Sequence, residues 1–371
     1  MRITTFKTVL ALMLAQLALT ACSDSKASPT AAKTSTKANV GQQPPATSAR
    51  TDSLTIATLN MCVGWQAEDL VVQKLSDSNV VYKAMADLYV QYKQSLPSIR
   101  MMIQAEMIMQ HPADVVALQE TQTMFAGDTE SFSFVDTLLA DLKAIGGPTD
   151  WTVVRQTLNQ ITLNVPDSAG DRMKLNFWEG NVFLVRSKLA VLDSTTAIYN
   201  EAVNLSILSQ PVGSHRGYTQ IRVQTPGGAI WQLFTTHLEV NLLSAYNLEQ
   251  GQELNAAAWN AWQSLDSGTQ VVLGDMNSKP GTGGVSALTG KTSGLVDLGK
   301  LTWSSSADSA ASFSCCIGDL QNSALNYDQR IDYILSRNFL KLVRMERVSM
   351  LQAGDWASDH AMLRATLTQQ F

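Results

Sequence analysis

The sequence has few cysteines, little charge and no apolar segment long enough to cross a membrane. Its 371 residues include four cysteines, and 16% of the residues are charged. So few cysteines in a chain of this length exclude a disulfide-stabilised scaffold. No stretch approaches 18 consecutive apolar residues, which excludes a polytopic membrane protein. The hydrophobic content of 45% is instead typical of a folded globular protein.

An excess of basic residues is also missing. Residues 1–52 hold six of the 27 Lys and Arg and two of the 32 Asp and Glu. The rest of the chain therefore has 21 basic and 30 acidic residues, a net charge of −9. Proteins that follow long nucleic acids along their phosphates are usually basic, so this composition argues against that class.

Several catalytic motifs are missing as well. The sequence contains no H-E-x-x-H and no C-x-x-C, which argues against a zinc site, and no G-x-S-x-G, which argues against a serine esterase. The segment that ends in Gly290-Lys291-Thr292 is similar to a phosphate-binding P-loop. The first glycine of that motif would fall on Val285, so the spacing is wrong by one residue.

The first 22 residues have the pattern of a secretion signal. Arg2 and Lys7 flank the polar start of the chain, and the apolar run 8–21 is shorter than the roughly 20 residues that span a bilayer core. The run ends in LTAC, which resembles the bacterial lipobox. This resemblance predicts a lipoprotein signal peptide over 1–21 and lipidation of Cys22, with a following serine that favours the outer membrane. The alternative is an ordinary secretion signal and a secreted protein.

The next segment predicts a tether. Residues 22–52 are mostly Ser, Thr, Ala, Lys, Pro and Gln, with almost no large apolar side chain. Such a segment cannot bury enough surface to offset its conformational entropy. We therefore expect a flexible tether over 22–52 and one globular domain over 53–371, lipid-anchored in the cell envelope.

Short β-branched segments alternate with helical patterns through this domain. The predicted strands cover 54–62, 114–120, 151–157, 181–187, 219–225, 230–240, 270–277, 330–336, 342–351 and 362–369. Helical patterns cover 68–110, 132–145 and 244–265, the last with Ser244 as N-cap, and the letters TPGG at 225–228 indicate a hairpin turn. Because hairpins mix with helical crossovers, we predict an α/β (α+β) chain with two mixed β-sheets packed face to face and helices outside.

Acid, amide and histidine side chains recur at the ends of these strands. They are Asn60, Glu120, His237, Asp275, Asn277, Asp332, Asp359 and His360. Each residue alone has a structural explanation as a cap, a turn residue or a core side chain. Together they indicate a site, because the ends of neighbouring strands converge on one rim of a sheet. The chain's other two histidines, His111 and His215, are expected at the surface.

The residue types indicate the chemistry. An oxygen ligand such as Glu120 suits a hard cation, Mg²⁺ or Mn²⁺. Asp275 and Asn277, two residues apart on a strand, point to the same side and can address one phosphate or one water. A histidine beside an aspartate supplies proton transfer. This combination fits in-line attack of water on a phosphate ester.

The motifs also carry a family resemblance. LTIATLNM, VVALQE, EGNVFLVRS, TTHLE, VVLGDMNSKP, RIDYIL and SDHAML occur in this order over about 54–369. The ordered set resembles the endonuclease/exonuclease/phosphatase superfamily, whose members are similar to deoxyribonuclease I. The resemblance implies a four-layer sandwich and a divalent-metal-dependent hydrolase of phosphodiesters, with DNA or RNA favoured as substrate and no stable protein partner.

Other substrates and roles stay open at this point. A phospholipid headgroup, as in the related sphingomyelinases, is the main alternative, supported by the membrane tether and by Trp65, Trp178 and Trp356, which we expect to be exposed. A phosphomonoesterase and a non-catalytic surface protein that kept the fold are further alternatives. Specificity in such folds lies in rim loops that the sequence pattern does not decode.

The resemblance further implies roles around the metal and the water. Glu120 would be the main metal ligand, with Asn60 and Asp359 close to the metal and the phosphate. Asp275 would orient or deprotonate the attacking water, and Asn277 would hold a phosphate oxygen.

It also implies roles for two histidines. His360, partnered by Asp332, would polarise the phosphate or act as a base. His237 would contact the phosphate or the leaving oxygen and would be oriented by Glu179.

Three features depart from the family pattern. Cys62 stands where some relatives have an acid that helps at the metal. About 60 residues with helical character separate the first two strands. The domain is acidic, although Arg186, Arg216 and Arg330 would make the mouth of the site attractive to phosphate.

The cysteines allow one disulfide. With Cys22 lipidated, Cys62, Cys315 and Cys316 remain, so an oxidising location permits one disulfide and leaves one thiol. We favour a disulfide that staples a loop over a catalytic thiol.

Overall fold

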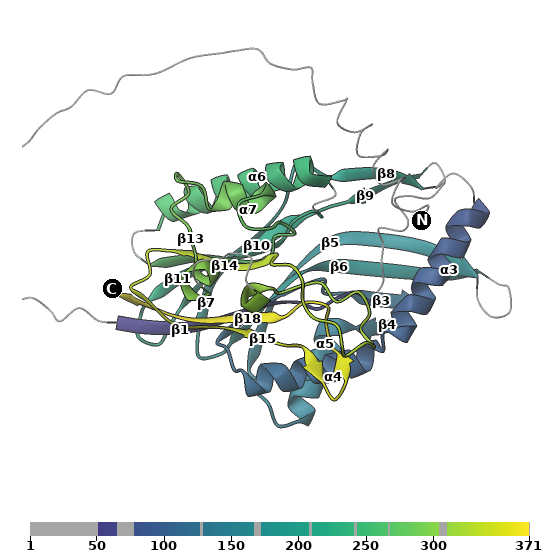
Figure 1. Cartoon of the computed structure of the whole chain (residues 1–371), viewed down its shortest axis with the longest axis horizontal. Coiled ribbons are helices and arrows are strands. Elements are labelled where there is room, and N and C mark those ends of the chain that lie inside the picture. The colour runs from purple at the N-terminus through teal and green to yellow at the C-terminus, as the bar shows by residue number, and fades with distance from the viewer. Residues whose placement is uncertain are drawn as a thin grey trace, which may run out of the picture. The chain divides into compact units, whose positions relative to one another are not determined.

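Two large β-sheets packed face to face make up most of this structure. The computed structural model describes residues 51–64, 78–126, 129–166, 172–207, 210–240, 243–265, 268–303 and 310–370. Within these residues, the predicted α/β arrangement of two mixed sheets with helices outside is confirmed (Figure 1).

The first sheet has eight strands in the order β15-β18-β1-β2-β6-β3-β4, with β5 also paired to β6. Its strands are β1 (Thr51–Asn60), β2 (Val115–Gln119), β3 (Thr123–Ala126), β4 (Thr129–Ser133), β5 (Trp151–Pro166), β6 (Arg172–Arg186), β15 (Lys341–Val348) and β18 (Met362–Gln370). β1 and β2 run parallel, with Asn60 beside Gln119 at their carboxyl ends. This register places the residue after β2, Glu120, next to the end of β1.

The second sheet has six strands in the order β13-β14-β12-β11-β10-β7. They are β7 (Ala190–Ile198), β10 (Gly217–Gln224), β11 (Ile230–His237), β12 (Thr269–Asp275), β13 (Val296–Asp297) and β14 (Asp332–Arg337). β11 and β12 are parallel, and their register pairs His237 with Asp275. β12 and β14 are antiparallel, and Asp275 faces Asp332. Three polar side chains therefore lie side by side at one end of this sheet.

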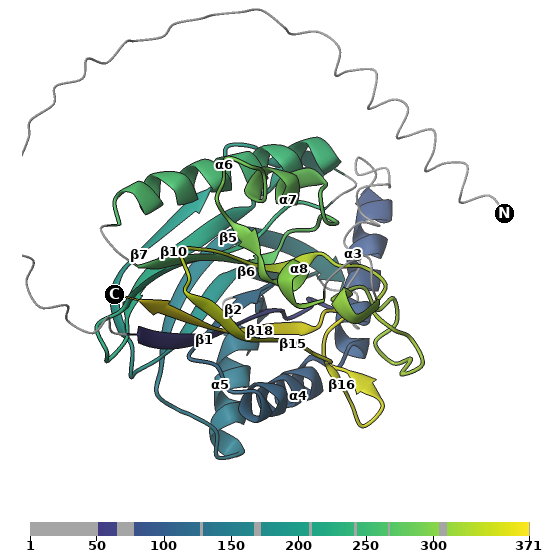
Figure 2. The ribbon, with the colours of Figure 1, turned by 60° about the vertical axis from the view of Figure 1, so that its left-hand side comes forward.

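Helices cover the outer faces of both sheets (Figures 1 and 2). The longer helices are α3 (Ser78–Gln94), α4 (Pro97–Gln110), α5 (Phe134–Ala144) and α6 (Ser244–Gln263). Shorter elements are α7 (Gly283–Leu288), α8 (Leu298–Thr302), η2 (Ala310–Ser312) and the two-stranded sheets β8 (Val203–Ile207) with β9 (Gln210–Ser214) and β16 (Leu351–Gln352) with β17 (Asp355–Trp356). None of the described helices is both long and apolar enough to cross a membrane.

The side chains of successive residues in the central strands pack into different hydrophobic cores. Val115 of β2 lies in the core between the sheets, whereas Val116 lies in the core beneath α4 and α5. Val271 of β12 also lies between the sheets, whereas Val272 packs beneath α6. Because successive side chains of a strand point to opposite faces, each central strand is covered on both sides. The result is the four-layer sandwich that the family resemblance implies.

Two predictions about helices need correction. The predicted helix over 68–110 is divided in its described part, since α3 ends before Leu96 and Pro97 begins α4. Leu96 has a φ of 50°, and a proline at the first helical position needs no backbone hydrogen bond there. Ser244 is the first residue of α6 rather than its N-cap, and the cap residue, Leu243, makes no side-chain cap bond.

Each predicted strand overlaps a strand of the two large sheets, including the edge strand β15, but several other strands are missed. The predicted strands at 151–157 and 181–187 are parts of one longer hairpin, β5–β6. The missed strands are β3, β4, β7, β8, β9 and the two-residue strands β13 and β17. The turn at 225–228 is confirmed, with Thr225 N–H donating to Ala229 O at 3.0 Å.

The tryptophans expected at the surface differ in burial. Trp178 is 40% exposed, whereas Trp356 is only 4% exposed. The Trp356 ring packs against Tyr327 with 5.1 Å between the centroids, and its indole N–H donates to Asn322 O. The prediction is therefore wrong for Trp356, and Trp65 lies outside the described residues.

Candidate active site

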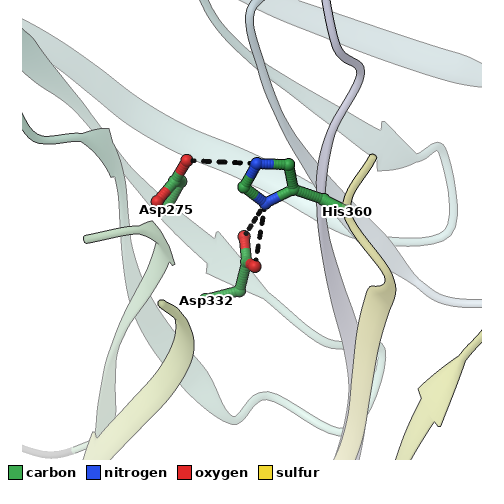
Figure 3. A group of neighbouring side chains, drawn as sticks. All are labelled: Asp275, Asp332 and His360. Carbon is green, nitrogen blue, oxygen red and sulfur yellow. Dashed lines mark hydrogen bonds and ion pairs between the residues drawn. The ribbon is translucent and has the colours of Figure 1, made fainter. Parts of the chain in front are cut away.

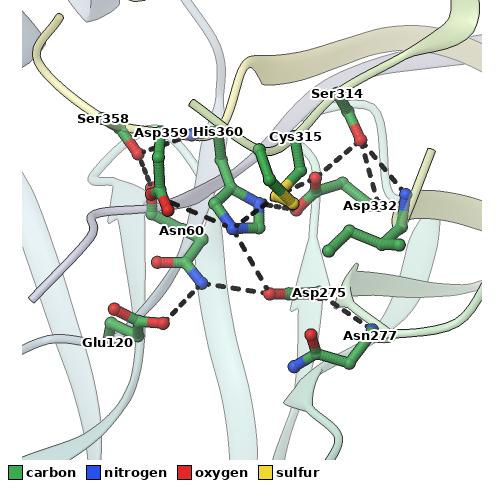
Figure 4. The surroundings of a disulfide bond; sticks show 12 residues. Asn60, Glu120, Asp275, Asn277, Ser314, Cys315, Asp332, Ser358, Asp359 and His360 are labelled. Atoms are coloured by element: carbon green, nitrogen blue, oxygen red, sulfur yellow. Dashed lines mark hydrogen bonds and ion pairs between the residues drawn. A yellow bond between two sulfur atoms is a disulfide. The ribbon is translucent and has the colours of Figure 1, made fainter. Parts of the chain in front are cut away.

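The side chains predicted to form a site converge on one rim where both sheets end. His237 and Asp275 are the last residues of β11 and β12, and Asp332 is the first residue of β14. Asn60 ends β1, and Glu120 follows β2 in the other sheet. Figure 4 shows residues of both sheets meeting there.

Asn60 connects the two sheets. Its Nδ2 donates to Glu120 Oε1 at 2.9 Å and to Asp275 Oδ2 at 3.1 Å (Figure 4). Its Oδ1 accepts the backbone N–H of Cys62 at 2.9 Å. Glu120 also accepts the backbone N–H of Val63 at 2.6 Å and has a φ of 54°, a conformation that non-glycine residues rarely adopt. The Asn60 amide thus fixes the spacing between two carboxylates from different sheets.

The carboxylates of this rim repel one another. Burial, followed by the charges of Asp359 and Glu179, raises the pKa of Glu120 to about 7. Burial also raises the pKa of Asp275 to about 6, with Asp332 adding to the rise while the charge of His360 opposes it. A divalent cation would relieve this repulsion, and carboxylate oxygens are its preferred ligands. The residues present therefore fit Mg²⁺ or Mn²⁺, which Glu120 and Asp359 would hold.

His360 and Asp332 form a buried pair. His360 Nδ1 lies 2.9 Å from Asp332 Oδ2, and this carboxylate also accepts the hydroxyl of Ser314 at 2.7 Å. The pair directs His360 Nε2 toward Asp275 Oδ2, 3.7 Å away (Figure 3). Burial opposes protonation of His360, but the charges of Asp332, Asp359 and Asp275 outweigh burial and hold its pKa well above the ordinary value. The imidazolium can therefore offer a proton from Nε2.

Asp275, Asp332 and His360 could alternatively form a metal site. One ligand atom each of Asp275, Asp332 and His360 lies within 4.8 Å of the others, close enough to hold a metal ion. However, Asp332 occupies Nδ1 of the imidazole with a hydrogen bond. This bond favours a proton-donating pair at Asp332 and His360, with the cation nearer Glu120.

His237 is neutral and directs a proton into the rim. Burial and the charges of Arg216 and His360 hold its pKa well below the ordinary value. Arginine can only donate, so the 2.8 Å contact from Arg216 Nη1 makes His237 Nδ1 the acceptor. The proton then lies on Nε2, 3.5 Å from Asp275 Oδ2. Asn277 Nδ2, which is also a donor, lies 2.9 Å from Nε2 and donates to Leu238 O at 2.9 Å.

Arg216 separates His237 from the residue that was expected to orient it. Its guanidinium lies 3.6 Å from Glu179 and 3.5 Å from Glu239. Burial lowers the pKa of Arg216, but the charges of Glu239 and Glu179 outweigh burial and raise it overall. Glu179 thus reaches His237 through Arg216 in this structure. From the sequence we predicted only that Arg216 would help to attract phosphate to the mouth of the site.

The other two arginines of that prediction pair with carboxylates that are not among the predicted site residues. Arg186, the last residue of β6, donates to Asp150 at 2.9 Å. Arg330 is buried and forms an ion pair with Asp297. Both guanidinium groups already have carboxylate partners.

The remaining predicted residues border the carboxylates. Asp359 is half-buried, and its Oδ1 lies 4.0 Å from His360 Nε2. Ser358 Oγ donates to Asn60 O at 2.7 Å, which attaches the loop before β18 to the end of β1. Burial and the charge of Asp359 raise the pKa of the Cys62 thiol well above its ordinary value. Cys62 therefore adds no negative charge where some relatives have an acid.

One disulfide and one free cysteine are present among the described residues. Cys315 and Cys316 form the disulfide, and Cys62 is free and buried. This agrees with the expected number. Because the bonded cysteines are adjacent in sequence, the disulfide does not staple the ends of a loop, and that part of the prediction is wrong.

Comparison with known proteins agrees with this geometry. The model of the Endonuclease/Exonuclease/phosphatase family matches residues 103–360. No curated protein matches the sequence. Among solved structures, a family protein from Bacteroides thetaiotaomicron has 15% identity and a TM-score of 0.53, over 87% of this chain and 97% of that one.

Two further solved structures have the same fold. The human Nocturnin catalytic domain with bound sulfate anion has 14% identity and a TM-score of 0.52, over 89% of this chain and 100% of that one. Truncated TDP2 from Caenorhabditis elegans has 12% identity and a TM-score of 0.51, over 85% of this chain and 97% of that one. At such identities the likeness concerns the fold alone.

Proposed function

The chain belongs to the endonuclease/exonuclease/phosphatase family of phosphate ester hydrolases, and from this premise we propose that it is a divalent-metal-dependent phosphodiesterase acting on nucleic acid. The supporting observation is the rim where both sheets end. There the Glu120 carboxylate lies on one side, the His360–Asp332 pair on the other, and Asp275 is linked to both.

The side chains of the rim divide the work of hydrolysis. Asp275 accepts N–H groups from Asn60 and Asn277 through its two oxygens, which leaves an oriented carboxylate to align and deprotonate the attacking water. His360 Nε2 and His237 Nε2 donate protons to phosphoryl oxygens, where negative charge develops during the displacement. A bound divalent cation, held by Glu120, Asp359 and Asn60, would add Lewis-acid stabilisation of that charge.

The exposed aromatic surface favours nucleic acid over a lipid headgroup. Trp178 is 40% exposed, packs against Phe125 with 4.6 Å between the ring centroids, and directly precedes Glu179 in β6. An indole in this position can stack on a base. Trp356, which would have supported a lipid surface, is buried. Since residues 53–371 carry a net charge of −9, we expect contacts with few phosphates and a weak dependence of binding on salt.

We also propose that the protein is tethered to the cell envelope. The sequence supports removal of residues 1–21, lipidation of Cys22 and a tether that holds the domain at the outer membrane. The predicted boundary at residue 52 is two residues too late, because β1 begins at Thr51. Mass spectrometry of the mature N-terminus tests this proposal. An unmodified Cys22 would instead support a secreted protein.

Plasmid nicking by the purified mature chain tests the activity. We expect nicking with Mg²⁺ that disappears in EDTA and in Asp275→Asn. Asp150→Asn is the matched control, because Asp150 pairs with Arg186 at the far end of β6. Hydrolysis of sphingomyelin without any nicking would replace the nuclease proposal with a lipid phosphodiesterase.

A further inference from the structure

The disulfide lies against the histidine pair of the active site. Cys315 forms isolated β-bridges with Gln329 and with His360. On either side, Ser314 O accepts the N–H of Ala361 at 2.7 Å, and Cys315 O accepts the N–H of Gln329 at 2.7 Å. The segment 314–316 is therefore held between the loop before β14, which leads to Asp332, and the loop before β18, which carries His360.

Both members of the histidine pair contact this segment. Ser314 Oγ donates to Asp332 Oδ2 at 2.7 Å, and it accepts the backbone N–H of Asp332 at 3.1 Å. Cys315 Sγ lies 3.4 Å from His360 Nε2 (Figure 4). Nε2 is the atom that faces Asp275 and the expected position of the phosphate. One sulfur of the disulfide thus borders the nitrogen that would donate the proton.

We propose that Cys315 is a positioning residue for His360, and that a dithiol reductant switches its effect by opening the Cys315–Cys316 disulfide. The inference rests on the phosphodiesterase activity proposed above. In the disulfide, the Cys315 sulfur has no proton and is a weak acceptor, so Nε2 stays available to the phosphate. As a free thiol, Cys315 is no longer held by the S–S bond, so its sulfur can rotate to accept the Nε2 proton in a better aligned hydrogen bond, and this bond competes with the phosphate oxygen.

The difference in burial between the two cysteines determines which sulfur the reductant attacks. Cys315 is 1% exposed, whereas Cys316 is half-buried. A thiolate of the reductant attacks Cys316 Sγ, the S–S bond breaks, and Cys315 Sγ leaves with the electron pair and takes up a proton. The second thiol of the reductant then displaces Cys316 as a thiol. The reductant becomes a disulfide, and two electrons and two protons have passed to the cysteines.

Kinetics of the mature chain under defined oxidation states test the proposal. The substrates are plasmid DNA and bis(p-nitrophenyl) phosphate, with dithiothreitol as reductant. The tryptic peptide 301–330 contains both cysteines and no other, so alkylation followed by mass spectrometry measures the open fraction. We expect opening to lower kcat about tenfold with little change in KM, and reoxidation to restore it.

Two single variants distinguish a hydrogen bond between the Cys315 thiol and His360 from simple loss of the disulfide. Cys316→Ala leaves the Cys315 thiol beside His360, so we expect a low kcat with and without reductant. Cys315→Ala also removes the disulfide but leaves no sulfur at Nε2. We therefore expect its kcat to be higher than that of Cys316→Ala and not to respond to reductant. Thermal unfolding of both variants monitors their folding.

Several results would overturn the switch. They are an open 301–330 peptide with unchanged kcat, a disulfide that stays closed in dithiothreitol, and equal losses of kcat in the two variants. Oxidised wild type that hydrolyses neither substrate would overturn the phosphodiesterase proposal itself, and the inference with it. Activity before reduction therefore distinguishes the two failures.

Discussion

The two halves of the site differ in how their charges are balanced. In the histidine half, His360 and Asp332 have opposite charges, lie 2.9 Å apart and are fixed by Ser314. In the carboxylate half, Glu120 and Asp275 have the same charge and are joined through the amide of Asn60. The first half is stabilised by its own pairing, whereas in the second half burial raises the pKa of both carboxyl groups, with Asp359 and Glu179 adding to the rise for Glu120 and Asp332 adding to it for Asp275.

This contrast assigns different tasks to the halves. A pair that is complete by itself is organised for catalysis before any ligand arrives. Like-charged carboxylates held close together, here Glu120 with Asp359, are a binding site for a cation, because the cation relieves their repulsion on arrival. Removing residues of the histidine half should therefore impair the chemical step. Removing the residue of the carboxylate half that would hold the cation, Glu120, should impair metal binding.

His360→Asn should have the largest effect. Asparagine can still donate to Asp332, but it lacks the proton donor at Nε2, so we expect kcat to fall about 10³-fold. Affinity for Mn²⁺, measured by calorimetry, should not change. His111→Asn, in which a half-buried histidine near Glu346 is replaced, is the control. A matching loss of Mn²⁺ affinity would place the metal at the trio of Asp275, Asp332 and His360.

Glu120→Gln should do the opposite and weaken metal binding more than the chemical step. Because loss of an outer partner already weakens metal binding 10- to 100-fold, loss of the main ligand should weaken Mn²⁺ binding by at least about 100-fold. Much of kcat should return at saturating Mn²⁺. Asp193→Asn, which alters a carboxylate paired with Arg222, controls for the change in net charge. Unchanged Mn²⁺ affinity would contradict the division between the halves.

The stability of the metal-free protein should depend on pH through the carboxylate half. Glu120 and Asp275, with pKa values of about 7 and about 6, bind protons more tightly in the folded chain than in the unfolded chain. Their stabilising contribution is complete below about pH 4 and is lost as pH rises through about 6 and about 7, at a cost of roughly 3 kcal/mol for each carboxyl group.

Thermal unfolding in EDTA measures this loss. We expect the unfolding temperature of wild type to fall between pH 4.5 and 7.5, by roughly 2–4 °C per kcal/mol. The unfolding temperature of the double variant Glu120→Gln/Asp275→Asn should fall less. Mg²⁺ should raise the unfolding temperature of wild type at pH 7.5. Parallel profiles for wild type and double variant would show that the like charges carry no such cost.

The sequence predicted best those residues that end an apolar strand. His237 and Asp275 each follow a β-branched run, and the parallel register of β11 and β12 brings them together. Arg216 precedes its strand, and its place beside His237 depends on the register that pairs Gly217 with His237. No local pattern encodes that register. Ser314 likewise lies in irregular chain, and its contact with Asp332 arises only when distant loops meet.

Trp178→Ala should have the smallest effect and tests whether the substrate extends over the carboxylate half. Trp178 precedes Glu179 in the first sheet, on the same side of the site as Glu120. Loss of one stacked base should raise KM for a short oligonucleotide about fivefold, at the low end for base stacking, with kcat unchanged. KM for bis(p-nitrophenyl) phosphate, which is too short to reach the indole, should stay constant. Trp259→Ala is the control, because Trp259 is 41% exposed on α6 and packs against Arg337. An equal rise of KM for both substrates would instead assign Trp178 to the structure of the rim, and the nucleic-acid proposal would lose its aromatic support.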